Sequence, residues 1–286
     1  MSDRWAVHHG DCREVMQAME PESIDSIVSD PPYPEINRPY GKMTEAEWHH
    51  LMEDVIHNAR RILKPSGSAV FILQPNSEHV GRMRPWLFEF MAKWSKEWNM
   101  VQDAWWWNTT SPPTVHCQRK HGLLRPSVKA CVWLGSPQCF RQQDAVLWEP
   151  SDSTKNANRE DRALKRLPSG QSMRRGRCVA ASDERGGVTP FNLLPISNGD
   201  SVSSSGAYGH GAGTPLSLAE WWVRYLTPDG GSVLDPFCGA GTVGIAAVES
   251  GFRFVGAELS PEYIEIARAR IGHAAGRTRQ KELALA

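Results

Sequence analysis

The chain lacks the features that mark several large classes of protein. Its 32 Lys and Arg residues balance 32 Asp and Glu residues, so the formal net charge is zero. Nucleic-acid-binding proteins often carry a basic excess, and the average charge therefore counts against such a partner. No apolar run approaches the ~20 residues that cross a bilayer. The first residues also lack the layout of a secretory signal. We expect a soluble, cytoplasmic protein without a membrane partner.

Cysteine is sparse, and its spacing excludes the common zinc sites. The six cysteines form no CxxC pair and no local Cys/His cluster with metal-ligand spacing. A single His116-Cys117 pair does not make a metal site. We therefore expect reduced thiols and no bound metal.

The composition is nevertheless that of a folded protein. The 286 residues are 40% hydrophobic and 22% charged, which is enough apolar material to bury a core. This length allows one large domain, or one domain with an inserted lobe.

Strand-like and helix-like segments alternate in the first third of the chain. Residues 24–30 read as a strand that ends at two prolines. Residues 44–63 have apolar positions at helical spacing, and Thr44 with Glu47 forms a capping-box pattern at their start. Residues 68–73 read as the next strand. This strand-helix-strand unit predicts a parallel sheet.

Later segments continue the alternation. Residues 83–98 and 215–226 read as helices, and 101–108 and 128–135 as strands. The three consecutive tryptophans at 105–107 favour an edge or core strand with one ring exposed over a base-stacking platform. The remaining predicted elements are a strand at 232–236, a Gly-rich turn opening a helix at 237–251, a strand at 252–259, a helix at 261–271 and a frayed tail from about 276.

The stretch from 141 to 209 differs from both flanks, because it is rich in Ser, Gly, Asn, Arg and Asp and has little periodicity. Within 155–177 it carries eight basic and two acidic residues, a net charge of +6, so the rest of the chain carries −6. A charge run by itself is more often a solvated surface than a binding site.

A glycine-rich motif predicts a nucleotide-like ligand. Residues 239–244 match G-x-G-x-x-G between a predicted strand and helix, and Glu258 follows Gly241 by 17 positions. Backbone amides at such a turn can approach a ligand while the carboxylate takes two ribose hydroxyls. No Lys-Ser/Thr follows the glycines, which excludes a P-loop. Only 28 residues follow Glu258, too few to complete a nicotinamide-binding sheet, so the missing strands come from upstream.

Asp30-Pro31-Pro32-Tyr33 stands at the carboxyl end of a predicted strand, where ligands of open α/β sheets bind. The prolines fix the backbone, which holds the Asp30 carboxylate and the Pro31 carbonyl as acceptors beside the ring of Tyr33. This arrangement suits the exocyclic amine of a planar base that has left its duplex. The alternative is a Pro-rich turn whose tyrosine covers the sheet edge, and the glycine motif with Glu258 makes it the weaker interpretation.

These motifs resemble those of the DNA amino-methyltransferases, which methylate adenine N6 or cytosine N4 with S-adenosylmethionine. Residues 30–33 are similar to the catalytic motif of that family, and 235–242, Asp-Pro-Phe-Cys-Gly-Ala-Gly-Thr, to its cofactor motif. The catalytic motif comes first, as in the beta-type order, which accounts for the upstream strands. The resemblance covers about 1–135 and 206–272 and does not extend to the central basic stretch.

The resemblance implies an α/β, Rossmann-like methyltransferase fold. Its sheet would be mostly parallel and doubly wound, with circularly permuted motifs and an inserted target-recognition region. We divide the chain into a catalytic half at 1–140, a target-recognition insert at 141–209 and a cofactor-binding half at 210–286.

Further positions follow from the resemblance, one at a time. Residues 9–12 are similar to a segment that contacts the cofactor adenine through Asp11 and the next backbone amide. Residues 210–215 resemble a loop that usually reads His-Pro-x-x-Lys-Pro, but the first Pro and the Lys are absent here. The implied cofactor-binding residues are Asp11, Cys12, His210, Thr214, Asp235, Phe237, Cys238, Gly239, Gly241, Thr242, Glu258 and Leu259.

The segment 125–135 resembles one that often carries His-Glu where this chain has Val128-Lys129. This departure bears on contacts to the target base. The implied catalytic residues are Asp30, Pro31, Pro32 and Tyr33. The +6 charge of the central stretch, and its position between the catalytic and cofactor motifs, predict phosphate contacts from the DNA-binding residues Arg159, Arg162, Lys165, Arg166, Arg174, Arg175 and Arg177.

The resemblance implies direct methyl transfer, in which Asp30 and Pro31 localise the lone pair of the amine and no protein nucleophile is needed. An Asp at the first motif position resembles adenine-N6 enzymes more than cytosine-N4 enzymes, which more often have Ser. We expect a site-specific adenine-N6 methyltransferase of double-stranded DNA. Cytosine-N4 transfer, an RNA or protein-amide substrate, and a DNA-binding subunit with a degenerate active site stay open. A homodimer and a companion restriction endonuclease stay open as partners.

Overall fold

The chain forms two units in the computed structural model. The first comprises Met1–Arg141 and Asn192–Ala286, and the second comprises Gln142–Phe191. The structure describes residues 4–37, 41–114, 117–149, 165–166, 172–173, 185–199 and 213–285.

The first unit is built on a nine-stranded sheet in the order β1-β13-β12-β2-β3-β8-β7-β11, with β6 beside β8. The strands from β1 to β3 in this order are parallel to their neighbours. β8 runs antiparallel to β3 and β7, and β11 is parallel to β7. The strands are β1 Trp5–His9, β2 Ile24–Ser29, β3 Leu63–Leu73, β6 Met100–Gln102, β7 Trp105–Asn108, β8 Val128–Gly135, β11 Leu193–Ile196, β12 Ser232–Asp235 and β13 Arg253–Glu258.

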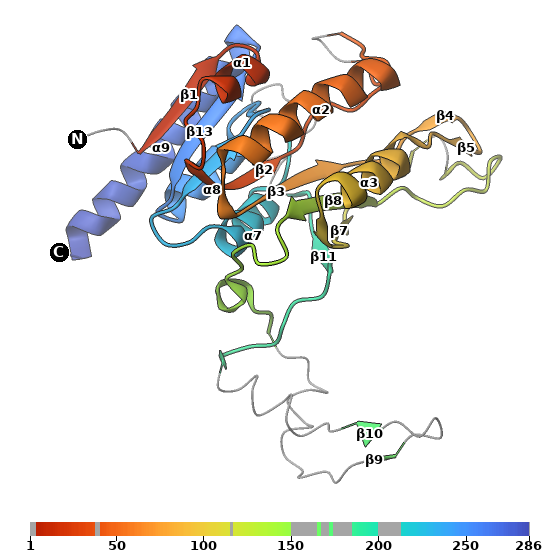
Figure 1. Ribbon diagram of the computed structural model, residues 1–286. Helices are drawn as coiled ribbons and strands as arrows, with labels where there is room; N and C mark the ends of the chain where they lie inside the picture. The colour runs from red at the N-terminus through yellow and green to blue at the C-terminus, as the bar shows by residue number, and fades with distance from the viewer. Residues whose placement is uncertain are drawn as a thin grey trace. The chain divides into compact units, whose positions relative to one another are not determined.

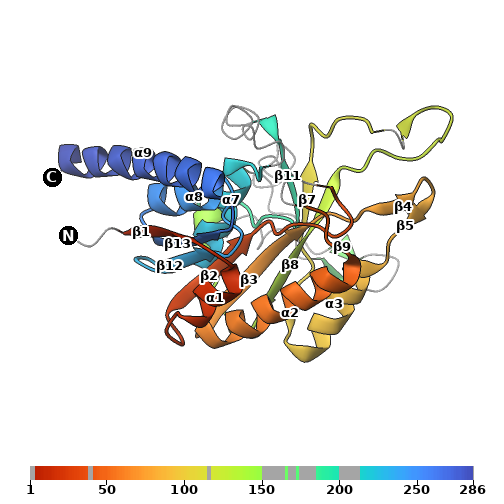
Figure 2. The ribbon, with the colours of Figure 1, turned by 90° about the horizontal axis from the view of Figure 1, so that it is seen from above.

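Helices cover both faces of this sheet (Figures 1 and 2). α2 (Glu45–Ile62) and α3 (Trp86–Glu97) lie on one face, and α7 (Leu216–Leu226), α8 (Thr242–Glu249) and α9 (Pro261–Leu285) lie on the other. This confirms the predicted doubly wound α/β fold. In the described part of the chain, no helix is long and apolar enough to span a membrane.

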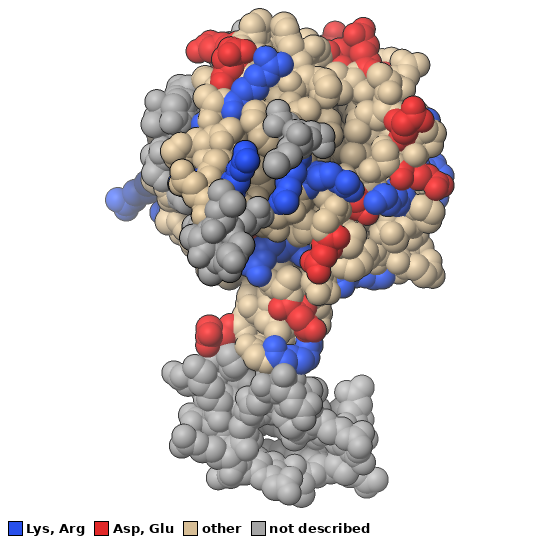
Figure 3. All heavy atoms as spheres, turned by 90° about the vertical axis from the view of Figure 1, so that its left-hand side faces the viewer, with Lys and Arg blue, Asp and Glu red and all other residues tan. Residues whose placement is uncertain are grey.

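Smaller elements complete the unit. The short helix α1 (Cys12–Gln17) packs against α2, and the strands β4 (Ser77–His79) and β5 (Arg82–Met83) form a hairpin between β3 and α3. On the face that Figure 3 draws, basic and acidic side chains of the described residues are interspersed.

The start of α2 confirms the predicted capping box. The Thr44 hydroxyl accepts a hydrogen bond from the Glu47 amide at 3.2 Å, and the Glu47 carboxylate accepts one from the Thr44 amide at 2.8 Å. The buried side of the helix includes Trp48, Met52 and Val55, each fully shielded from solvent. The capped start and the apolar stripe together fix α2 on the sheet.

The tryptophan run has the predicted structure, whereas the chain end does not. Trp106 in β7 is buried, and Trp107 is 43% exposed, as predicted for an edge or core strand with one exposed ring. The predicted frayed tail was wrong, because α9 continues to Leu285. Residues 277–285 are mostly Arg, Gln, Lys, Glu, Leu and Ala, which are strong helix formers, and Gly276 does not interrupt the helix.

The second unit is held by contacts of its own. Trp148 and Val188 exchange two backbone hydrogen bonds of 2.9 Å, and the Trp148 ring packs edge-on against Phe191. Arg185 pairs with Asp144 at 2.5 Å. Two short strands, β9 (Lys165–Arg166) and β10 (Ser172–Met173), pair antiparallel.

One pairing joins the two halves of the sequence within the sheet. β12 lies parallel to β2, with Val233 opposite Ser26. Beside it the buried Asp25 carboxylate accepts hydrogen bonds of 2.8 Å from the Lys64 ammonium and from the Ser232 amide. Asp25 thereby links three strands, β2, β3 and β12.

The Asp25→Ala variant is therefore expected to lower the free energy of unfolding by about 2–3 kcal/mol, because it leaves a buried backbone amide without its acceptor. Asp25→Asn, which keeps an acceptor, loses less. Denaturant unfolding measures both, with Asp229→Ala at an exposed turn as the matched control. A stability of Asp25→Ala equal to that of the control would contradict this role.

Candidate active site

The predicted motif residues meet at one edge of the sheet, although they are far apart in the sequence. β1, β13, β12 and β2 are parallel neighbours, so their carboxyl ends share an edge (Figure 2). Glu258 ends β13, Asp235 ends β12 and Asp30 directly follows β2. Asp11 follows the end of β1. Ligands of open α/β sheets bind at such an edge.

The glycine-rich turn after β12 depends on residues without a side chain. Gly239 and Gly241 adopt φ angles of 51° and 82°, in the left-handed region that favours glycine. A Cβ atom on Gly241 would lie 3.1 Å from the Ala267 Cα of α9. The glycines therefore permit both the sharp turn and the close approach of α8 to α9.

Backbone amides fix the Glu258 carboxylate. Its two oxygens accept hydrogen bonds of 2.8 Å, one from the Gly239 amide and one from the Ser260 amide. Each carboxylate oxygen can accept a second bond. The arrangement leaves an oriented acceptor pair that suits two adjacent hydroxyls.

Asp235 is 3% exposed and is bound from the neighbouring strand. Its Oδ1 accepts hydrogen bonds from the Ser29 hydroxyl at 2.5 Å and from the Phe237 amide at 3.1 Å. Burial raises the pKa of Asp235 to about 7. Near neutral pH this carboxyl group therefore populates both protonation states.

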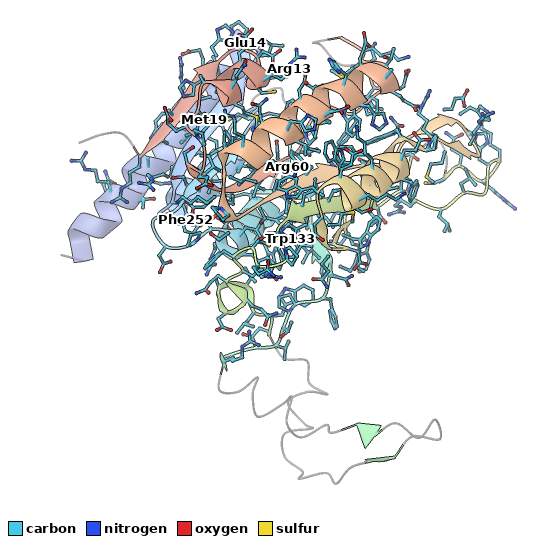
Figure 4. All side chains as sticks on the ribbon, in the orientation of Figure 1. Arg13, Glu14, Met19, Arg60, Trp133 and Phe252 are labelled. Carbon is cyan, nitrogen blue, oxygen red and sulfur yellow. The ribbon has the colours of Figure 1, made fainter. Side chains whose placement is uncertain are left out.

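Asp11 caps the N-terminus of α1 and is held by Arg13. Its carboxylate accepts hydrogen bonds from the Arg13 amide at 2.8 Å and from Arg13 Nη2 at 2.7 Å. These bonds lower the pKa of Asp11. Figure 4 labels Arg13 on α1, where it also reaches Asp54 at 3.4 Å. The orientation of Asp11 is thus fixed from its own helix.

Two cysteines at this edge are buried thiols. Burial raises the pKa of Cys12 to about 12 and that of Cys238 well above its usual value. Both thiols therefore stay protonated, which makes them small apolar wall groups rather than nucleophiles.

Three donors surround the Asp30 carboxylate. The Tyr33 hydroxyl donates to Asp30 Oδ1, and the Thr214 hydroxyl donates to Oδ2 at 3.0 Å. The Lys129 ammonium lies 3.4 Å from Oδ2 and donates to the Tyr33 hydroxyl at 3.0 Å. Lys129, Tyr33 and Asp30 therefore form a closed ring of polar contacts in which the carboxylate is held in one orientation.

The same ammonium lies over two aromatic rings. Lys129 Nζ is 5.3 Å from the centre of the Tyr33 ring and 5.0 Å from that of Trp106. Cation–π attraction at these distances adds to the hydrogen bonds. The side chains of Lys129 and Asp30 are only 18% and 17% exposed, so the charges are poorly screened by water.

The turn after Asp30 is anchored through its carbonyl groups. The Pro32 carbonyl accepts a hydrogen bond from Trp48 Nε1 at 2.6 Å, and the Pro34 carbonyl accepts one from Asn76 Nδ2 at 2.7 Å. Trp86 Nε1 in turn donates to Asn76 Oδ1 at 2.9 Å. The buried faces of α2 and α3 therefore help to position the turn.

Only some of the predicted site residues are brought into contact with one another. Asp30, Tyr33 and Thr214 are in direct contact, although the resemblance placed Thr214 on the cofactor side. Leu259 is 66% exposed. His210 and five of the predicted DNA-binding residues lie outside the described residues, and the other two form β9. These five are Arg159, Arg162, Arg174, Arg175 and Arg177.

Lys129 is the residue whose contacts the sequence did not reveal. The only signal was that Val128-Lys129 departs from the resembled segment, which often carries His-Glu there. Among the described residues, no group of three or more His, Cys, Asp or Glu side chains is placed to hold a metal ion.

Known proteins resemble this chain along most of its length. M.PvuII, a type II methyltransferase of Proteus hauseri, is 25% identical over 278 residues, which cover 91% of this chain and 81% of the relative. The solved PvuII DNA methyltransferase, described as cytosine-N4-specific, superposes with a TM-score of 0.69 at 20% identity, covering 96% of this chain and 92% of that one. The M1.HpyAVI–SAM complex has a TM-score of 0.56 at 18% identity and covers 93% and 98%.

The likenesses to solved structures agree with the fold, and the match to a family model defines a site-specific DNA methyltransferase, a class that uses S-adenosylmethionine. The model of the DNA methylase family of N6 and N4 methyltransferases matches residues 24–269. The chain belongs to this family, and DNA is its substrate.

The raised pKa of Asp235 predicts a pH-dependent stability. Between about pH 4 and pH 7 the folded state holds a proton that the unfolded chain has lost, so stability falls as the pH rises through this window. From pH 5 to pH 7 this amounts to about 2 kcal/mol. Asp235→Asn, which cannot titrate, should lack this component. Urea unfolding of both proteins at the two pH values measures it, and equal pH dependence would refute it.

Proposed function

We propose that the chain methylates adenine N6 at a specific site in double-stranded DNA, with Asp30 as the acceptor that orients the amine. The observation that carries the proposal is the held carboxylate of Asp30 at the sheet edge, one strand away from Asp235. Each further step uses a group already positioned there.

The residues on the cofactor side fit S-adenosylmethionine. Glu258 presents an oriented acceptor pair for the ribose hydroxyls, and the left-handed φ angles of Gly239 and Gly241 turn the backbone sharply after the strand end. The resemblance adds Asp235 and Phe237 to the pocket. When bound, the cofactor supplies a methyl group already activated on a sulfonium. No protein nucleophile is required, which agrees with the protonated thiols of Cys12 and Cys238.

Asp30 would act on the amine of a base that has left the duplex. The lone pair of an aromatic amine is delocalised into the ring, and hydrogen bonds from its N–H groups to Asp30 and the Pro31 carbonyl direct it out of the ring. The negative charge of Asp30 also stabilises the positive charge that develops on the nitrogen. After transfer, the carboxylate is placed to accept the proton that the nitrogen loses. Orientation alone supplies up to about 7–11 kcal/mol in favourable systems.

The choice of base rests on the first motif position. Asp30 resembles adenine-N6 enzymes, whereas cytosine-N4 enzymes more often carry Ser there. The likeness to a solved structure described as cytosine-N4-specific favours cytosine as the second candidate. The Asp30 carboxylate, held by Thr214 and Tyr33, is a stronger acceptor than a serine hydroxyl and suits an exocyclic amine of either base, so the preference for adenine rests on the motif position.

Nucleoside mass spectrometry tests the base and the role of Asp30 together. DNA treated with the wild-type protein and S-adenosylmethionine should yield N6-methyladenine, and N4-methylcytosine alone would overturn the adenine proposal. Asp30→Ala should lose at least about a thousandfold in turnover, because orientation and charge stabilisation go together. Its affinity for S-adenosylmethionine, measured by calorimetry, should stay within about twofold. Near-normal turnover of Asp30→Ala would refute the role of Asp30.

Lys129→Met tests whether the ammonium positions Asp30 and Tyr33. Losing a charged hydrogen bond should lower kcat by about tenfold, with cofactor affinity unchanged, and Lys129→Arg should restore part of the rate. Lys93→Met is the matched control, because Lys93 also has an ion pair, 3.0 Å to Glu53, and lies 5.1 Å from the Trp94 ring. An unchanged kcat in Lys129→Met would show that the contacts at Asp30 do not serve the reaction.

A further inference from the structure

A basic loop emerges from the sheet directly beside Asp30. β7 and β8 form an antiparallel pair in which Trp106 lies opposite Lys129, the two residues that contact each other beside the catalytic motif. The last hydrogen bond between the two segments is donated by the Asn108 amide to the Ser127 carbonyl, at 2.8 Å. The segment 117–127, called the basic loop below, therefore leaves the sheet two positions before Lys129.

The basic loop carries one sign of charge. Arg119, Lys120 and Arg125 are exposed. The sequence between Asp103 and Asp144 contains no acidic residue, so nothing in the segment neutralises them. In a chain whose overall net charge is zero, this is a cationic surface beside the site, and it is distinct from the predicted basic stretch at 155–177.

Two exposed leucines lie among these cations. Leu124 is 92% exposed and Leu123 is 41% exposed, although leucine is among the side chains that folded proteins usually bury. The apolar surface continues to the base of the loop, where Trp107 is 43% and Val128 39% exposed.

Internal hydrogen bonds hold the basic loop in place. The Ser111 hydroxyl donates to the Pro126 carbonyl at 2.8 Å, and Arg125 Nη1 donates to the Ser111 carbonyl at 3.2 Å. The Gly122 amide donates to the Gln118 carbonyl at 3.1 Å, which closes one turn. The Leu124 carbonyl accepts from the Cys117 thiol at 3.6 Å. The leucine is therefore presented by an ordered turn.

We infer that the basic loop grips the DNA duplex next to the target base and that Leu124 enters the stack when that base leaves it. The cations would contact phosphates, and the leucine would fill the space of the departed base. Apolar side chains inserted between base steps are a known way to unstack DNA. This inference rests on the proposed transfer to a base drawn out of the duplex.

Substitution of Leu124 tests the wedge, and its exposure means that the fold does not depend on it. Two duplexes carry the site that the wild type methylates, one fully paired and one with an abasic position opposite the target. Leu124→Ala should lower kcat/KM about tenfold or more on the paired duplex and less than about threefold on the other, since the abasic duplex has already lost the pairing. Leu124→Phe, which keeps an apolar wedge, should restore most of the rate.

Substitution of the cations tests the grip. In fluorescence anisotropy titrations over a series of salt concentrations, the Arg119→Gln, Lys120→Gln double variant should bind the duplex more weakly, with a log–log salt slope shallower by about 2. Lys96→Gln is the control. Lys96 lies in the last turn of α3, three positions before Asn99. The Asn99 carbonyl accepts a hydrogen bond of 3.2 Å from the amide of Gly135, which is the end of β8 that lies away from the basic loop.

Several outcomes would overturn the inference. For Leu124→Ala, these outcomes are a normal rate on the paired duplex or an equal loss of rate on both duplexes. A change in the oligomeric state of Leu124→Ala, measured by sedimentation, would instead make the leucine a contact between copies of the chain. For the double variant, the contradicting outcome is a salt slope unchanged from that of the control. If the wild type methylates no DNA, the proposed function fails, while the anisotropy arm still tests the grip on its own.

Discussion

The parallel pairing of β2 with β12 is the constraint on which the site depends. It places two strands from opposite parts of the sequence side by side, so that the turn after β2 and the turn after β12 open at the same sheet edge. The Ser29 hydroxyl, 206 positions from Asp235, then bonds to its carboxyl group across this junction. The Asp25 carboxylate secures the other end of the junction. A permuted order of motifs is possible because strand pairing, and not chain order, brings the catalytic and cofactor segments together.

Three carboxyl groups at this edge differ because their surroundings differ. Glu258 is held by two backbone amides and keeps acceptor capacity toward the edge. Asp235 is buried with few donors, and its pKa is raised to about 7. Asp30 is bound by hydroxyl groups and faces an ammonium. The cationic cofactor and the amine that becomes positive would therefore meet carboxyl groups that differ in burial and in hydrogen-bond partners.

Local sequence signals predicted most of the fold, and long-range contacts were beyond them. Features that depend on residues adjacent in the sequence were predicted from local sequence patterns. They are the capping box at Thr44, the glycine turn at Gly239 and Gly241, and the strand ends at Asp30 and Glu258. The contact of Lys129 with Asp30 joins residues 99 positions apart, and that of Thr214 joins residues 184 apart. Such contacts follow from the strand order of the finished sheet, which spacing along the chain does not encode. The continuation of α9 to Leu285 was missed, although residues 277–285 are mostly strong helix formers.

The most direct test of the account is a crystal structure of the chain with a duplex carrying its target site and sinefungin, an unreactive analogue of S-adenosylmethionine. We expect the target base out of the stack, with its exocyclic nitrogen within hydrogen-bond distance of an Asp30 carboxylate oxygen and of the Pro31 carbonyl. The ribose hydroxyls of the analogue should lie on Glu258. A target amine bound elsewhere, with Asp30 still closed by Lys129 and Tyr33, would contradict it.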